Sequence, residues 1–202
     1  DYYDYIELPG DRLAIVLADV SGKGVPAALL MATLSAETRY CLASASDPAT
    51  AMTRLNTKFS SRGWDDRFVT MVMAVVDLQT NKLMLVNAGH MPPLLRHRDG
   101  SVAEVGEECS GVPLGVDPDA TYEQATLEFQ PGDAIAMFTD GLSEAMNDGD
   151  DLYGIERLRQ RLSSIESACA KQLGQSLLDD VRGFVGKRAQ SDDMCVTCVS
   201  RA

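Results

Sequence analysis

The chain has 202 residues, of which 45% are hydrophobic, and its formal net charge is −12. This length and apolar content are typical of one well-packed domain, and no apolar run approaches the ~20 residues of a membrane span. The acidic balance leaves no basic surface for a nucleic acid, so that class of partner is excluded.

The five cysteines are scattered, and an odd number of them is typical of reduced thiols in a cytoplasmic protein. Cys195 and Cys198 have a Cys-x-x-Cys spacing, but they fall in a predicted strand. Positions three apart in a strand face opposite sides, so both thiols are predicted to be structural and not to share a zinc ion.

The first part of the chain predicts strands and two helices. Tyr2-Tyr3 lies at the start of one strand, and an apolar run over 13–18 predicts another. Apolar residues at helical spacing predict a helix over 25–45, with Pro26 in its first turn. A second helix is predicted to run from Asp47, its N-cap, to about Ser60.

The rest of the chain predicts mostly strands, followed by two helices. The predicted strands cover residues 68–78, 82–87, 94–97, 123–129, 134–139 and 194–200. The first two form a hairpin, and 94–97 is expected to continue the same meander, with Asp99-Gly100 as its turn. Helices are predicted over 154–162 and 168–188. Because helices and strands are segregated, the fold class is α+β with mostly antiparallel sheet.

A glycine-flanked lysine follows the strand over 13–18, in the order Gly22-Lys23-Gly24. A nucleotide-binding P-loop needs a further glycine at the position held by Leu17 and a Ser or Thr at the position held by Gly24. Both requirements fail, so this kind of phosphate loop is excluded.

Six aspartates share a place at the end of a predicted strand, and they are Asp1, Asp4, Asp19, Asp140, Asp192 and Asp193. Carboxylate oxygens are ligands for hard cations such as Mg²⁺ or Mn²⁺, whereas zinc would need His or Cys. The two histidines, His90 and His97, cannot build a zinc site by themselves. The alternative stays open, since aspartate is also common in turns and helix caps.

Together these segments resemble the metal-dependent (PPM, type 2C) serine/threonine protein phosphatases, and among them the bacterial SpoIIE/RsbU-like branch. The matching segments are DYYDY from Asp1, ADVSGKGVPAALLM from Ala18, FVTMVMAVVD from Phe68, NAGHMPPLL from Asn87, GVPLGV from Gly111, FTDGLSEAMN from Phe138 and SDDMCVTCV from Ser191. Each is weak alone, but together they cover essentially the whole chain in order. The resemblance implies an αββα sandwich, with two mostly antiparallel sheets flanked by helices, and makes residues 1–202 one phosphatase domain.

The resemblance also implies a centre of two Mn²⁺ or Mg²⁺ ions. The implied ligands are Asp1, Asp19, the backbone carbonyl of Val20, Asp140 and Asp192, with Asp193, Asp4, Lys23 and His90 as secondary candidates. A metal-bound water attacks phosphorus in this mechanism. Asp19 and Asp140 then act through that water, and no Ser or Cys nucleophile is nominated.

The sequence departs from the family's patterns at a few positions. Ser21 stands where the eukaryotic enzymes commonly have His, which leaves protonation of the leaving group unassigned. Met91 replaces an Asn that is usual in the bacterial branch. No arginine is assigned to the substrate phosphate, and Arg12 and Arg67 are the candidates.

Two of the secondary candidates have alternative interpretations. Lys23 either meets the substrate phosphate or is simply solvated. His90 either shapes a loop beside the site or is a hydrogen-bonded structural residue.

By resemblance, the chain is expected to hydrolyse phosphoserine or phosphothreonine on an anti-sigma-factor antagonist in a bacterial partner-switching pathway. The alternatives are a catalytically silent interaction module of the same fold and a hydrolase of small phosphoesters. The presence of every expected aspartate favours the active phosphatase.

The chain opens with Asp1, without an initiator Met and without the two glycines usual before this aspartate. We therefore expect a domain cut from a longer cytoplasmic protein with an N-terminal sensor or receiver domain. That domain is expected to move the two helices that follow Gly24 and so to govern metal occupancy.

Overall fold

The computed structural model describes residues 1–63, 67–166 and 169–201. The chain forms two compact units. The first unit comprises Asp1–Pro92 and Gly106–Glu128, and the second comprises Pro93–Val105 and Phe129–Ala202.

The first unit contains a six-stranded sheet in the order β1-β2-β3-β4-β7, with β8 also paired to β4. Its strands are β1 (Tyr2–Leu8), β2 (Arg12–Val20), β3 (Val69–Asp77), β4 (Lys82–Ala88), β7 (Ser110–Gly111) and β8 (Gln124–Glu128), and a 3-10 turn, η1 (Glu107–Cys109), precedes β7. All of these pairs are antiparallel except β4 with β7.

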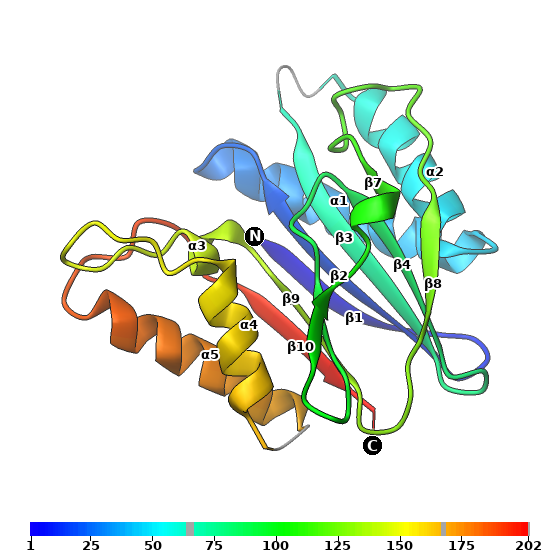
Figure 1. Ribbon diagram of the computed structural model, residues 1–202. Helices are drawn as coiled ribbons and strands as arrows, with labels where there is room; N and C mark the ends of the chain where they lie inside the picture. Colours follow the sequence, from blue (N-terminus) through cyan, green and yellow to red (C-terminus); the bar gives the residue numbers. More distant parts are fainter. Residues whose placement is uncertain (64–66, 167–168, 202) are drawn as a thin grey trace. The chain divides into compact units, whose positions relative to one another are not determined.

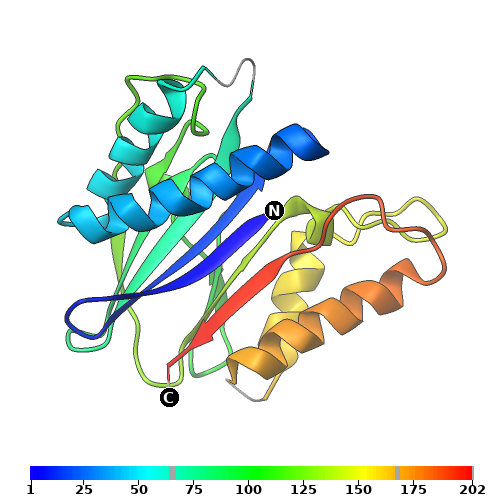
Figure 2. The same cartoon turned by 180° about the vertical axis from the view of Figure 1, so that it is seen from behind.

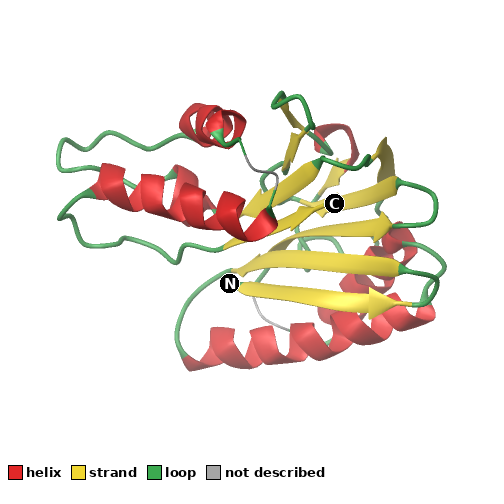
Figure 3. Ribbon diagram, turned by 90° about the horizontal axis from the view of Figure 1, so that it is seen from below, coloured by secondary structure: helices red, strands yellow, loops and turns green. Residues whose placement is uncertain are grey.

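Two helices, α1 (Val25–Ser44) and α2 (Pro48–Ser60), cover one face of this sheet (Figures 1 and 3). Leu30 and Leu34 of α1 pack with Met52 and Leu55 of α2 in the core beneath them, and all four side chains are buried. Burying a side chain of this kind contributes about 1.5–3 kcal/mol, so this core holds the helices on the sheet.

Asp47 caps α2, as its position before Pro48 predicts, because its Oδ1 accepts a hydrogen bond from the Thr50 N–H at 2.7 Å. Asp47→Ala is therefore expected to cost about 1 kcal/mol of stability in chemical unfolding. The hydrogen bonds from Ser46 and from the Thr50 N–H hold the pKa of Asp47 below its usual value. A lowered pKa stabilises the fold above the unfolded value of about 3.9, so the cap's contribution should be lost as the pH falls through the folded pKa.

The exposed Asp119, whose side chain caps no helix, provides the matched control for this measurement. Asp119→Ala should change stability by less than about 0.5 kcal/mol, both at neutral pH and at a pH below the folded pKa of Asp47. Equal losses for the two variants at neutral pH would contradict the capping role.

The second unit contains a four-stranded antiparallel sheet in the order β10-β9-β5-β6. Its elements are β5 (Leu94–Arg96), β6 (Val102–Glu104), β9 (Ala134–Phe138), α3 (Asp140–Ser143), α4 (Ile155–Ser164), α5 (Ala170–Val185) and β10 (Val196–Ser200). Helix α5 packs along β10 (Figure 2), and α4 packs against β5 and β6. The buried Arg96 of β5 donates from Nε to the Leu162 carbonyl of α4 at 3.1 Å, which ties the sheet to the end of that helix.

The prediction that 94–97 continues the meander of 82–87 is wrong. Strand β5 pairs with β6 and β9 in the second sheet, while β4 pairs with β3, β7 and β8. Gly89 has a φ of +67°, and Pro92 and Pro93 lack N–H groups for a ladder, so the chain leaves the first sheet here.

Other boundaries differ from the predictions by a few residues. The helix predicted to reach Arg188 ends at Val185, because Gly186 takes a φ of 67° and a ψ of -116°, a non-helical conformation that glycine adopts more readily than other residues. Its predicted start at Ala168 lies outside the described residues. The short elements β6, β7 and α3 were not predicted, since two to four residues are too few for a periodic pattern.

Candidate metal centre

Asp1 and Asp19 lie at one end of the first sheet. Tyr2 pairs with Ala18, so Asp1 and Asp19 flank this pair on adjacent strands. Tyr2 and Ala18 belong to the core beneath the helices. Side chains alternate along a strand, so both aspartates share the opposite face.

Asp4 does not share that face. It accepts a hydrogen bond from Arg39 Nη2 of α1 at 2.6 Å on Oδ1 and one from the Tyr2 hydroxyl at 3.0 Å on Oδ2. Asp4 is three positions from Asp1, so the period of two turns it toward the helix side. The structure therefore does not bring Asp4 together with Asp19, and its carboxylate holds α1 to β1 instead.

The loop that follows Asp19 is fixed to the start of β3. The Ser21 N–H donates to the Phe68 carbonyl at 3.0 Å, and the Phe68 N–H donates to Ser21 Oγ at 2.9 Å. Arg67 Nη1 donates to the Ser21 carbonyl at 3.0 Å. Three bonds at one residue fix the backbone next to Val20, whose carbonyl is an implied ligand. Ser21 thus anchors the loop, which explains a serine at this position.

The two candidate arginines lie at opposite ends of β2. Arg12 begins the strand and donates from Nε to the Pro9 carbonyl at 2.9 Å, far along the strand from Asp19. Arg67 lies over Gly22, where a Cβ would be only 2.5 Å from Nη1. Of the two candidates, Arg67 therefore lies beside the loop that follows Asp19, and Arg12 does not.

Replacing Arg67 with alanine is expected to loosen the loop after Asp19. A hydrogen bond from a charged donor contributes about 1.5–3 kcal/mol when it is shielded, so a loss near 1.5 kcal/mol is expected in chemical unfolding. The Ser21 amide should also exchange its hydrogen faster. Arg12→Ala, which removes a bond in an exposed turn, is the control and should leave that amide unchanged. Unaltered Ser21 exchange in Arg67→Ala would contradict this role.

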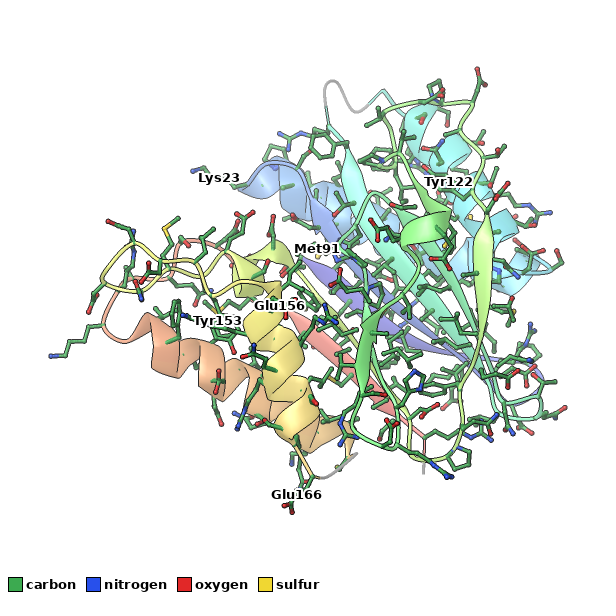
Figure 4. All side chains as sticks on the ribbon, viewed as in Figure 1. Lys23, Met91, Tyr122, Tyr153, Glu156 and Glu166 are labelled. Carbon is green, nitrogen blue, oxygen red and sulfur yellow. The ribbon has the colours of Figure 1, made fainter. Side chains whose placement is uncertain are left out.

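Lys23 is exposed, and its side chain points outward from the loop (Figure 4). This exposure fits a solvated side chain better than a fixed ligand.

His90 is buried in a turn closed by Asn87. The His90 N–H donates to Asn87 Oδ1 at 2.7 Å, and Asn87 Nδ2 donates to the His90 carbonyl at 2.9 Å. The His90 ring Nδ1 lies 2.8 Å from Thr70 Oγ1. His90 is therefore hydrogen-bonded through both its backbone and its ring in the turn after β4.

In the second unit, Asp140 lies at the same end of the β9–β10 ladder as Asp192 and Asp193. Val196 pairs with Phe138, and the Thr139 N–H donates to the Cys195 carbonyl at 3.1 Å. The buried Thr139 hydroxyl accepts from the Cys195 N–H at 3.2 Å and donates to the Asp193 carbonyl at 3.4 Å. These bonds hold the acidic pair beside the first turn of α3.

Gly141 explains the close approach of these two segments. A Cβ at this position would lie 1.9 Å from the Asp193 carbonyl oxygen, closer than any side chain permits. Asp192 and Asp193 are both exposed, and Asp192 Oδ1 accepts from the Asp193 N–H at 2.8 Å. Only glycine, which has no Cβ, allows the loop of Asp192 and Asp193 to come this close to the residue after Asp140.

Among the described residues, the sulfur and nitrogen donors are not gathered into a group that could hold zinc. Burial raises the pKa of the Cys198 thiol to about 12 and also raises the pKa of Cys41 and of Cys195, which disfavours the thiolates that zinc binds. His97 lies in the second unit, 3.6 Å from Asp133, whereas His90 is in the first.

The oxygen donors fit Mg²⁺ or Mn²⁺ chemically. Asp1 and Asp19 belong to the first unit, and Asp140, Asp192 and Asp193 belong to the second. No group of three His, Cys, Asp or Glu residues that could hold a metal is found in the part of the chain that the structure describes. Each unit thus contributes its own share of the expected donors.

Sequence reasoning missed two threonines near these aspartates, Thr70, whose hydroxyl meets the His90 ring, and Thr139, whose hydroxyl bonds the backbone of Asp193 and Cys195. Both lie inside matched segments, but a threonine in a β-branched run is typical of any strand. Only the pairing of the strands shows which group each hydroxyl meets.

The fold is that of the PP2C-type phosphatase domains. The RsbU and RsbW domains of a Mycobacterium tuberculosis protein match with a TM-score of 0.85 and 28% identity, over 98% of this chain and 54% of that one. The phosphatase domain of Bacillus subtilis SpoIIE, solved with a fragment of its regulatory domain, matches with a TM-score of 0.84 and 21% identity, over 98% of this chain and 57% of that one. The predicted fold class, with two mostly antiparallel sheets flanked by helices, is confirmed.

The chain belongs to the SpoIIE family, since the profile described as stage II sporulation protein E matches residues 9–202. Protein IcfG of Synechocystis is 25% identical over all of this chain and 36% of its own length. Phosphoserine phosphatase RsbU of Bacillus subtilis is 29% identical over 71% of this chain and 42% of its own length. The chain thus spans less than half of these relatives. None of its described helices has the length and apolar character needed to cross a bilayer.

Proposed function

We propose that this chain is a metal-dependent phosphoprotein phosphatase that hydrolyses phosphoserine or phosphothreonine. The observation that carries the proposal is the gathering of strand-end aspartates in each unit, Asp1 with Asp19 and Asp140 with Asp192. Membership of the SpoIIE family and the phosphoserine phosphatase activity named for RsbU support it.

The proposed ligands are Asp1, Asp19, the Val20 carbonyl, Asp140 and Asp192, with Asp193 beside them, and the proposed ions are two Mn²⁺ or Mg²⁺. Short aspartate side chains at strand ends are held by the backbone, and their hard oxygens suit these cations. RsbX, whose solved structure shares this fold with a TM-score of 0.71 and 14% identity, was solved in complex with magnesium.

When bound, a pair of divalent cations supplies hydroxide at neutral pH and neutralises charge on the phosphoryl oxygens. The residues of the chain hold the proposed ligands in position. Ser21 and Arg67 hold the loop next to Asp19, while Thr139 and Gly141 hold the acidic pair next to Asp140. This mechanism needs no Ser or Cys nucleophile.

The proposed substrate is a phosphorylated anti-sigma-factor antagonist in a bacterial partner-switching pathway. The resemblance to RsbU supports this choice, as does the matching solved chain that carries an RsbU and an RsbW domain. We also propose that residues 1–202 act as one phosphatase domain controlled by an N-terminal sensor or receiver domain. The regulatory-domain fragment solved with SpoIIE supports such control.

The test is phosphate release by the purified chain from a phosphoserine-bearing antagonist protein, with Mn²⁺ or with a chelator. Release that requires Mn²⁺ is expected. Binding of the phosphoprotein without release would indicate a silent interaction module, and release from an aryl phosphate alone would indicate a small-phosphoester hydrolase. Either result would overturn the proposal.

A further inference from the structure

Thr70 lies directly across the ladder from Asp19. The register of β2 and β3 pairs these two residues, and their neighbours Ala18 and Met71 belong to the helix-side core. Both side chains therefore lie on the other face of the sheet. Directly opposed residues of antiparallel strands have Cβ atoms about 4.5–5.5 Å apart, so a hydroxyl on one can reach a carboxylate on the other.

The far side of Thr70 is held by His90. The ring Nδ1 of His90 lies 2.8 Å from Thr70 Oγ1, and the residue is only 7% exposed. The fully buried Asn87 bonds both the N–H and the carbonyl of His90. His90 is thus fixed at its backbone by Asn87, and its ring Nδ1 faces the Thr70 hydroxyl.

We propose that His90 is a positioning residue that orients the Asp19 carboxylate through Thr70. An ionised carboxylate only accepts hydrogen bonds. In the proposed arrangement, the Thr70 hydroxyl therefore donates its one hydrogen bond to Asp19. Thr70 must then accept from His90, which requires the imidazole proton on Nδ1. The chain of donors runs from His90 Nδ1–H to Thr70 Oγ1–H and on to the Asp19 carboxylate.

This inference deepens the proposed function and rests on the proposed role of Asp19 as a metal ligand. A carboxylate held by an oriented hydroxyl loses fewer rotamers when it binds a cation, and hydrogen bonds in a chain strengthen one another. Removing such a support typically weakens metal binding by about 10–100-fold. His90 therefore acts on the metal without touching it.

The first test measures Mn²⁺ affinity of the chain by calorimetry. Thr70→Val, which keeps the shape and removes the hydroxyl, should weaken binding by about 10-fold, and Thr70→Ser should restore it to within about 3-fold. His90→Ala should match Thr70→Val, and the double variant should lose no more than either single one, because both act through one hydroxyl. Thr126→Val in β8 of the same sheet is the matched control and should bind as the wild type does.

Wild-type affinity in Thr70→Val, or losses that multiply in the double variant, would overturn the inference. So would a Thr70→Ser variant as weak as Thr70→Val. Thermal unfolding without metal shows whether each variant is folded.

The second test reads the tautomer and needs no variant of Thr70. The chain has two histidines, so His97→Gln leaves the ¹⁵N signals of His90 alone in the imidazole region. A proton on Nδ1 is expected at neutral pH, and a proton on Nε2 alone would overturn the inference.

Asp19→Asn separates this inference from the proposed function. If Asp19→Asn loses Mn²⁺ while Thr70→Val keeps it, only the positioning role fails. If Asp19→Asn binds Mn²⁺ like the wild type, the ligand assignment fails and the positioning role fails with it.

Discussion

Asp19→Asn and Asp140→Asn are each expected to lower Mn²⁺-dependent phosphate release by more than about 100-fold. Asparagine keeps the shape of the side chain but removes the negative charge that holds a divalent cation. The two aspartates come from different units, so each variant tests a different half of the proposed ligand set. Initial rates at saturating phosphoprotein, measured across a Mn²⁺ titration, give the comparison.

Asp119→Asn is the matched control, because it removes the same charge from an exposed turn of the first unit. It should keep wild-type turnover. Both ligand variants should unfold at temperatures close to that of the metal-free wild type, so that lost activity is not lost structure. Undiminished release by either variant would remove that aspartate from the centre.

Gly141→Ala is expected to destabilise the chain by about 1–3 kcal/mol, the usual cost of forcing an extra carbon into a packed site. The new Cβ would stand 1.9 Å from the Asp193 carbonyl oxygen, so the backbone that carries Asp192 and Asp193 must shift. Because that backbone holds the proposed ligands, Mn²⁺-dependent turnover should fall as well. Chemical unfolding and phosphate release measure the two effects.

Gly183→Ala provides a control with the opposite sign. Gly183 is exposed within α5, and a Cβ there would meet no atom within 4 Å. Alanine in a helix interior is more stable than glycine by about 0.5–1 kcal/mol. This variant should therefore unfold at a higher denaturant concentration than the wild type. If Gly141→Ala behaved like Gly183→Ala, the close approach to Asp193 would be refuted.

Much of the local structure follows from patterns within a few residues. The helix over 25–44, the cap at Asp47 and the buried strand over 134–138 depend on periodicity and on side chains near in sequence. The face of Asp4 could also be predicted, because Asp4 is three positions from Asp1 and side chains alternate along a strand. The two aspartates were grouped together only because both flank Tyr2 and Tyr3.

The α+β class, the order of most elements and the aspartates at strand ends could all be predicted, because these features depend on neighbours along the chain. Three features could not be predicted: β5 leaves the first sheet, Arg67 and not Arg12 lies beside the loop after Asp19, and His90 meets Thr70. They depend on strand pairing, which joins residues far apart in sequence. The register of such a pair is set by packing across the whole sheet, and no local pattern records it.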